Sequence, residues 1–213
     1  FGAFISHSQV LLQDFSNLSN NSSADVYGGF GGGQTAANTA VADPADSSNT
    51  VRQVTVTAAG DVWKGIFMRP QTHYMDLTAN QTVSLKVYST TAIHLRGIIQ
   101  GGQSGQTTID DAANTVAHAG AGWETISFTF TGATGEWSEL AIRTSVDAAG
   151  ALNNTAAYTA YVDDLTAVQG SAILTPTLQD FSTLKNNTPE DVYGGFGGGQ
   201  TAANTAVADP ADS

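Results

Sequence analysis

The stretch Val83-Ser84-Leu85-Lys86-Val87 alternates apolar and polar side chains with a period of two. Because successive side chains of a β-strand point to opposite faces, it predicts a strand with its valines and leucine on a core and Lys86 toward solvent. Similar alternation recurs along the chain between turn-type clusters of Gly, Asn, Asp, Ser and Pro, and helical periodicity is nearly absent. The strands predicted in this way are Val51–Val56, Val62–Met68, Val83–Val87, Ile93–Ile99, Ile126–Phe130, Leu140–Val146 and Tyr158–Val168. Their number and spacing predict an all-β fold, an antiparallel β-sandwich of the jelly-roll type.

A long internal repeat sets the predicted domain organisation. Every residue from Asp25 to Ser47 recurs from Asp191 to Ser213, at a constant offset of 166 residues, so one repeat has the size of a domain. The predicted parts are an N-terminal segment or linker (1–10), a jelly-roll repeat domain (11–169), a linker (170–176) and the beginning of a second, truncated repeat (177–213). Either the polypeptide continues beyond Ser213, or 177–213 completes a sandwich with another copy of the chain, as in strand donation.

The composition disfavours several classes of partner. Only 12% of the 213 residues are charged, and the formal net charge is −12. Nucleic acids and anionic membrane surfaces attract basic proteins, so neither is expected to bind this chain. No run of apolar residues is long enough to predict insertion into a membrane. A β-rich core covered by uncharged polar side chains is common in secreted bacterial modules, and we predict an extracellular or cell-surface location.

Six stretches, in order and at matching spacing over about residues 11–168, resemble motifs of a known family. They are Gln13-Asp14-Phe15, Val41–Val51, Trp63-Lys64-Gly65, Leu85–Ser89, Trp123–Phe130 and Tyr161–Leu165. The family is that of the jelly-roll carbohydrate-binding modules appended to bacterial laminarinases and other polysaccharide-degrading enzymes. The resemblance implies a jelly-roll fold, a polysaccharide as partner and a structural calcium ion.

The calcium ligands implied by this resemblance come from both ends of the fold. In such modules the ion often ties the first strand, a following loop and the last strand together, through the oxygen donors that Ca²⁺ prefers. The matching residues here are Asp14, Asp46, Asn49 and Asp163. The chain has Ser16 where the family often has Glu, so the implied site has one carboxylate fewer. The alternative is that these side chains cap turns in solvent.

Candidate sugar-binding residues combine aromatic rings, which stack on the C–H faces of sugars, with polar side chains that bond to hydroxyls. Trp137 follows Gly135-Glu136 and is expected in an exposed loop, whereas strand parity does not decide which way Trp63 points. Few basic residues exist, and several fall inside predicted strands with their side chains away from the core. The predicted ligand-binding set is Trp63, Lys64, Lys86, His94, Arg96, Trp137 and Arg143.

If the strands carrying the basic residues share one sheet, the positive charges converge on one face. Such a face could hold a carboxylated or sulfated polysaccharide, because arginine pairs bidentately with anionic groups. The alternative is that these residues form salt bridges with neighbouring carboxylates, each contributing little at the surface.

Catalysis has little support in the sequence, and we predict that the chain is not an enzyme. The repeat domain contains only Glu124, Glu136 and Glu139 as glutamates, and nothing marks a glycosidase pair among them. No nucleophile-elbow motif, zinc-protease motif or cysteine is present. The main hypothesis is a polysaccharide-binding module of a tandem-repeat secreted or surface protein. The alternative is a structural or adhesive repeat of a filament or long adhesin, in which 177–213 mediates assembly between chains.

Overall fold

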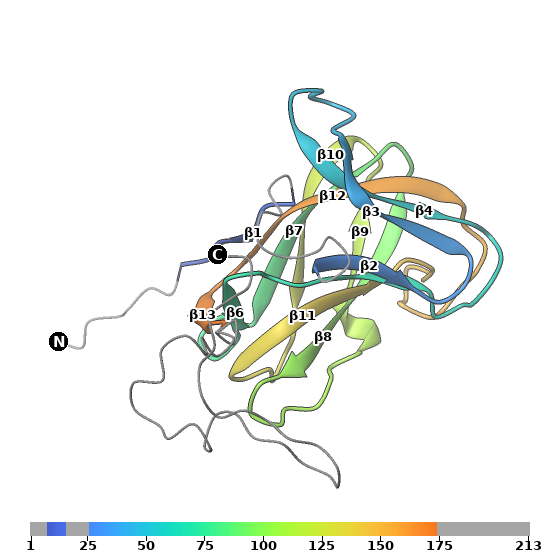
Figure 1. Cartoon of the computed structure of the whole chain (residues 1–213). Coiled ribbons are helices and arrows are strands. Elements are labelled where there is room, and N and C mark those ends of the chain that lie inside the picture. Colours follow the sequence, from blue (N-terminus) through green and yellow to red (C-terminus); the bar gives the residue numbers. More distant parts are fainter. Residues whose placement is uncertain (1–7, 16–25, 174–213) are drawn as a thin grey trace, which may run out of the picture. The chain divides into compact units, whose positions relative to one another are not determined.

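The computed structural model describes residues 8–15 and 26–173, which form two antiparallel β-sheets packed face to face (Figure 1). The predicted all-β sandwich is therefore confirmed. The predicted second repeat, 177–213, lies outside the described residues. Within the described residues, no helix is long and apolar enough to cross a bilayer.

The first sheet has the strand order β10-β7-β12-β4-β3, with β1 pairing along part of β12. Its strands are β1 (Val10–Gln13), β3 (Gln34–Ala42), β4 (Thr50–Val56), β7 (Thr82–Ser89), β10 (Gly122–Thr129) and β12 (Tyr158–Ala167). β1, which was not among the predicted strands, lies beside β12, the last of them, so segments far apart in the sequence meet in one sheet.

The second sheet is built around β11, which pairs with β8 along one edge and with β5 and β6 along the other. Its strands are β2 (Tyr27–Phe30), β5 (Gly65–Met68), β6 (His73–Asp76), β8 (Ile93–Gly102), β9 (Thr115–His118), β11 (Glu136–Arg143) and β13 (Gln169–Ala172). A short 3-10 helix, η1 (Ala112–Asn114), precedes β9. Because β13 pairs with β6, the second sheet continues into the segment 170–176 that was predicted as a linker.

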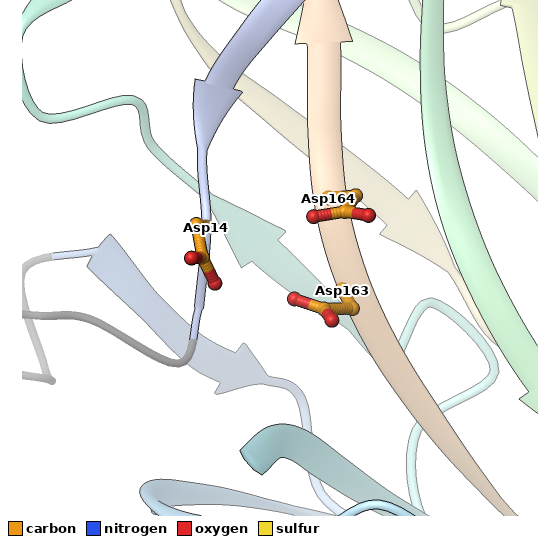
Figure 2. A group of neighbouring side chains, drawn as sticks. All are labelled: Asp14, Asp163 and Asp164. Carbon is orange, nitrogen blue, oxygen red and sulfur yellow. The ribbon is translucent and has the colours of Figure 1, made fainter. Parts of the chain in front are cut away.

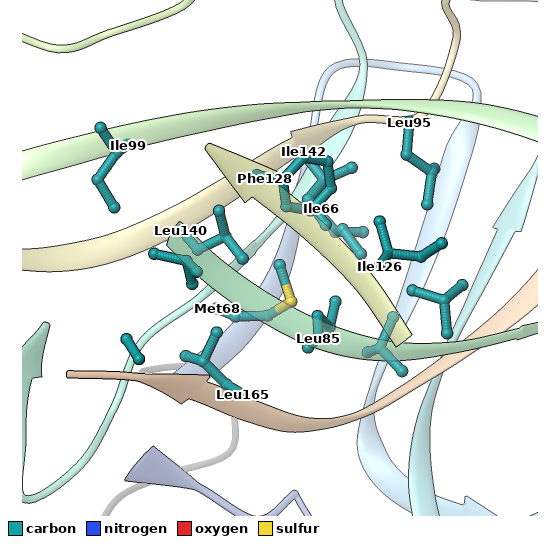
Figure 3. Close-up of a cluster of buried hydrophobic side chains, with 14 of the residues drawn as sticks. Ile66, Met68, Leu85, Leu95, Ile99, Ile126, Phe128, Leu140, Ile142 and Leu165 are labelled. Carbon is teal, nitrogen blue, oxygen red and sulfur yellow. The ribbon is translucent and has the colours of Figure 1, made fainter. Parts of the chain in front are cut away.

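The core lies between the two sheets and is made of aliphatic and aromatic side chains (Figure 3). Leu85 of the first sheet and Ile66, Met68, Leu140 and Ile142 of the second are all buried there. Each such side chain contributes about 1.5–3 kcal/mol by leaving water, so a core of this size can stabilise a domain without disulfides. The predicted parity is confirmed, because Val83, Leu85 and Val87 are buried while Lys86 is exposed.

Candidate functional site

Two phenylalanine rings lie over glycines on the outward face of the second sheet. A Cβ atom built on Gly65 would come within 2.4 Å of Cζ of the Phe30 ring, and one on Gly28 within 2.6 Å of Cζ of the Phe67 ring. Gly65 is the cross-strand partner of Phe30, and Gly28 that of Phe67. The missing side chains therefore let both rings lie down across β2 and β5. We call the surface formed by Phe30, Trp63, Phe67, Arg69, Gln100, Glu139 and the Arg96–Asp110–Arg143 cluster the ring face.

Trp63 extends the ring face beyond the strands. It lies in the turn before β5, 46% exposed, nearly parallel to Phe30 with an angle of 8° and ring centroids 6.3 Å apart. Arg143 holds this pair in place: its Nη1 donates to the Trp63 carbonyl at 2.5 Å, and its guanidinium lies 5.5 Å from the Phe30 centroid. Strand parity did not decide which way Trp63 points. In the structure Ile66 and Met68 point to the core, and Trp63 is open to solvent.

Arg96 and Arg143 point outward, as parity predicted, and lie directly opposite each other on β8 and β11. Both bind Asp110 of the β8–β9 connection: Arg96 Nε donates to Oδ1 at 2.8 Å, and Arg143 Nη2 to Oδ2 at 2.9 Å. Burial alone would raise the pKa of Asp110, but hydrogen bonds from Arg143 and Arg96 outweigh it and lower that pKa. The salt-bridge alternative is thus correct for both arginines, and both pair with Asp110 within the protein. The sequence reasoning missed Asp110, because a loop carboxylate has no periodicity.

A second polar group lies beside Phe67 on the same face. Arg69 Nε donates to Glu139 Oε2 at 2.6 Å, and the Arg69 guanidinium carbon lies 4.5 Å from the Phe67 centroid. Gln100 Nε2 donates to the other oxygen of Glu139. The face therefore combines aromatic rings with amide and guanidinium groups, and its arginines pair with its carboxylates.

Lys64, predicted as a ligand residue, is completely buried. Its amine donates to the carbonyls of Thr57 and Ala59 at 2.8 and 2.7 Å, and to Oδ1 of Asn154. Burial lowers the pKa of the amine, and the charge of Asp61 opposes that effect. The ligand role is wrong because turn carbonyls before β5 and β12 surround the amine and exclude solvent. Lys64 ties the two turns together.

Replacing Lys64 by methionine should lower the free energy of unfolding by about 1–3 kcal/mol, because three acceptors lose the buried amine that joins them. Lys86→Met is the matched control. Lys86 is half-exposed and pairs with Asp164 at 2.6 Å, so its loss should change stability by less than about 1 kcal/mol. Urea unfolding of both variants measures the difference, and equal losses would contradict the structural role of Lys64.

The remaining predicted ligand residues do not join the ring face. Trp137 is buried, with 1% exposure, because it lies in β11 opposite Met75 rather than in a loop. Lys86 lies on β7 of the first sheet, so the predicted convergence of charges is wrong for it. His94 lines a separate cleft of about 280 Å³ with Asp147, Asn153 and Tyr158.

Three carboxylates meet where β1 runs beside β12, on the first sheet (Figure 2). One oxygen each of Asp14, Asp163 and Asp164 lie within 4.8 Å of one another. Neighbouring residues of a regular strand point to opposite faces, but the pairing of β12 is irregular after Asp163, and Asp164 has a φ of 49°. This irregularity brings both carboxylates into the group. The sequence reasoning missed Asp164, because strand parity places it on the face opposite Asp163.

The predicted calcium ligands are only partly brought together. Asp14 and Asp163 are in the group, and Oδ1 of the buried Asp163 has no hydrogen-bond partner. Asn49 contacts Asp163 through its amide nitrogen, which donates to Oδ2 at 3.2 Å and is no metal ligand. Asp46 is outside the group: it caps its own exposed turn by accepting from the Ser48 backbone N–H and hydroxyl at 3.0 and 2.7 Å. The turn-cap alternative is therefore correct for Asp46.

Among solved structures, the chain is similar to carbohydrate-binding modules, the class that the sequence motifs resemble. One is a family 11 module from Clostridium thermocellum in complex with a β-1,3-1,4-mixed-linked tetrasaccharide, with 14% identity, 76% of this chain and 96% of that one covered, and a TM-score of 0.48. Another is a family 22 xylan-binding domain from Paenibacillus barcinonensis, with 14% identity, 77% and 98% coverage, and a TM-score of 0.43. No protein-family model and no curated protein matches the sequence. At this identity the likeness is one of fold.

Proposed function

We propose that this chain is a non-catalytic extracellular module that binds a neutral polysaccharide on its ring face. The observation that carries the proposal is the exposed Trp63 ring beside the parallel Phe30 ring, with both held by Arg143. Planar rings stack on the C–H faces of sugar units, and fixed polar groups beside them can bond to hydroxyls. Gln100, Glu139 and Arg69 supply such groups next to Phe67.

The pairing of charges favours a neutral ligand over a carboxylated or sulfated one. Arg96 and Arg143 share Asp110, and Arg69 pairs with Glu139. An anionic sugar would have to displace a carboxylate that is already hydrogen-bonded to the guanidinium, so it gains little from the arginines.

The same pairing supports a non-catalytic role. A glycosidase needs one carboxylic acid that stays protonated and one carboxylate that stays ionised. Asp110 and Glu139, the carboxylates of the ring face, both pair with arginine, and hydrogen bonds from Arg143 and Arg96 lower the pKa of Asp110. The ring face therefore has groups for holding a sugar, and both of these carboxylates are already engaged by protein side chains.

Affinity electrophoresis of the full chain tests this proposal. Migration is measured in native gels containing mixed-linked β-glucan, xylan or polygalacturonate, at a salt concentration held constant. Retardation by a neutral polysaccharide and none by polygalacturonate is expected. Retardation by polygalacturonate alone would contradict the neutral-ligand proposal, and retardation by none of the three would contradict binding to these glycan classes.

The verbatim repeat favours a second candidate function, a structural or adhesive unit that assembles through residues 177–213. Near-identical copies suit a chain of spacers, because each copy offers the same surface to the next. Sedimentation velocity of chains 1–213 and 1–173 over a range of concentrations tests it. Self-association of the longer chain alone supports assembly through 177–213, whereas two monomers contradict it.

We also propose that Asp14, Asp163 and Asp164 hold a calcium ion. Three carboxylates, one just after β1 and two on β12, fit an oxygen-preferring cation, as does the unpartnered buried oxygen of Asp163. Burial raises the pKa of Asp163, and the neighbouring charges of Asp164 and Asp14 act in the same direction. A bound cation would offset this repulsion and join β1 to β12.

Chelation should therefore lower the melting temperature of the chain by about 5–10 °C, as expected for an ion present well above its dissociation constant. Asp163→Asn should abolish the response to chelator, whereas Asp46→Asn should retain it because Asp46 only caps a turn. Differential scanning calorimetry with and without EDTA measures both. An unchanged wild-type transition would contradict the metal site.

A further inference from the structure

A second set of aromatic side chains lies on the outward face of the first sheet. Trp123 is the cross-strand partner of Tyr88, Tyr88 that of Tyr161, and Tyr161 that of Gln53. These four residues therefore form one row across β10, β7, β12 and β4, which we call the aromatic row. Trp123 and Tyr88 have ring centroids 5.6 Å apart, and Tyr88 and Tyr161 5.9 Å, both edge to face.

The aromatic row is partly open to solvent and is fixed by hydrogen bonds. All three rings are of intermediate exposure. Gln53 Nε2 donates to the Tyr161 hydroxyl at 3.2 Å, and Trp123 Nε1 donates to Asp43 Oδ1 at 2.9 Å. Such bonds hold the rings in one arrangement in advance, which lowers the entropy cost of binding a ligand.

A row of exposed hydroxyls runs beside the aromatic row. Thr159, Thr55 and Thr35 are cross-strand partners on β12, β4 and β3, and all three are exposed. Thr55 and Thr159 share a hydroxyl–hydroxyl contact of 3.3 Å. Rings beside parallel hydroxyls match a sugar chain, which presents C–H faces and hydroxyl edges side by side.

We propose that the aromatic row is a second polysaccharide-binding face, which takes a neutral glycan chain lying across the strands. This inference rests on the proposed function, because it assumes that the chain is a polysaccharide-binding module. The row of threonine hydroxyls beside the rings favours a polyhydroxylated ligand over a protein partner. Lys86 on the same face pairs with Asp164 at 2.6 Å, which favours an uncharged ligand.

Two binding faces on opposite sheets would let the module bind two polysaccharide strands at once, which a single face does not allow. A glycan on the aromatic row cannot contact Trp63, so one chain can engage two polysaccharide strands at once. Linked binding of this kind raises the apparent affinity for a fibrous or insoluble polysaccharide far more than for a short soluble oligosaccharide.

The test uses the full chain and isothermal titration with a neutral oligosaccharide that binds the wild type, together with pull-down on the matching insoluble polysaccharide. Tyr88→Leu keeps apolar bulk but removes the ring at the centre of the row. Trp63→Ala removes the exposed ring of the ring face, and Thr125→Ala is the surface control on β10. In the titration, each ring substitution should remove one class of binding sites and leave one oligosaccharide bound per chain. In the pull-down, it should weaken the apparent affinity for the insoluble polysaccharide about tenfold, which corresponds to about 1.4 kcal/mol. The double variant should not bind.

The outcomes separate the two proposals. If Trp63→Ala abolishes all binding and Tyr88→Leu changes none of it, the aromatic row is not a binding face and the ring face stands. If Tyr88→Leu abolishes binding and Trp63→Ala does not, the ring face is wrong and the aromatic row stands. If the wild type binds no neutral polysaccharide, both proposals fall.

Should Tyr88→Leu unfold, the emission of Trp123 provides a second readout in the folded variant Trp63→Phe. Trp137 is buried and should not respond, so a saturable change on adding glycan reports the aromatic row. A constant emission spectrum at saturating glycan would overturn the proposal.

Discussion

Replacing Trp137 by alanine is expected to lower the free energy of unfolding by about 3–5 kcal/mol, the usual cost of deleting a large buried aromatic side chain. Trp137 is 1% exposed in β11, opposite Met75, and its indole N–H donates to the Thr134 carbonyl at 3.1 Å. The substitution leaves a cavity at the junction of β6 and β11 and removes one of the two side-chain donors to the Thr134 carbonyl, the other being Gln106. Losses of this size are a large fraction of the stability of most domains.

Urea unfolding followed by circular dichroism measures this effect. Trp63→Ala is the matched control, because it removes the same side chain from an exposed position and should change stability by less than about 0.5 kcal/mol. A loss below about 1 kcal/mol for Trp137→Ala would mean that the side chain lies in an exposed loop, as the sequence pattern suggested.

The same Trp63→Ala substitution should weaken the binding of a neutral oligosaccharide at the ring face by roughly 30-fold, because a central exposed aromatic residue typically supplies 2 kcal/mol or more of a binding free energy. The loss includes the stacking surface of Trp63 and the support that it gives to Phe30. Isothermal titration of the ring-face sites measures the change.

Leu152→Ala is the control for this second prediction, since Leu152 is also exposed, lies outside the strands of both sheets and should leave affinity unchanged. An affinity for Trp63→Ala within twofold of the wild type would remove Trp63 from the binding site.

The fold could be predicted because alternation fixes which side chains face inward. Lys86, Arg96 and Arg143 all point outward as predicted. Alternation does not tell which strands share a sheet, so Lys86 on β7 was grouped wrongly with the two arginines on β8 and β11. Which strands pair in one sheet depends on contacts between residues far apart in the sequence, and local patterns do not encode those contacts.

The candidate site was harder to predict, because several of its members lie outside regular alternation. The stretch Tyr27-Gly28-Gly29-Phe30 has no clear apolar–polar alternation, yet it forms β2, and its glycines make room for neighbouring rings. Asp110 lies in a connection and acts only through arginines from two other strands. A glycine opposite an aromatic residue on the paired strand was the available signal for the ring face. It can be recognised only once the register between the two strands is known.

The most direct test of the ring face is nuclear magnetic resonance of the ¹⁵N-labelled chain during titration with a neutral oligosaccharide. The indole N–H signals of Trp63, Trp123 and Trp137 report the ring face, the aromatic row and the core respectively. We predict that the Trp63 signal moves in a saturable manner while the Trp137 signal stays in place. A Trp63 signal that does not move while the protein becomes saturated would contradict the proposal that this chain binds polysaccharide on its ring face.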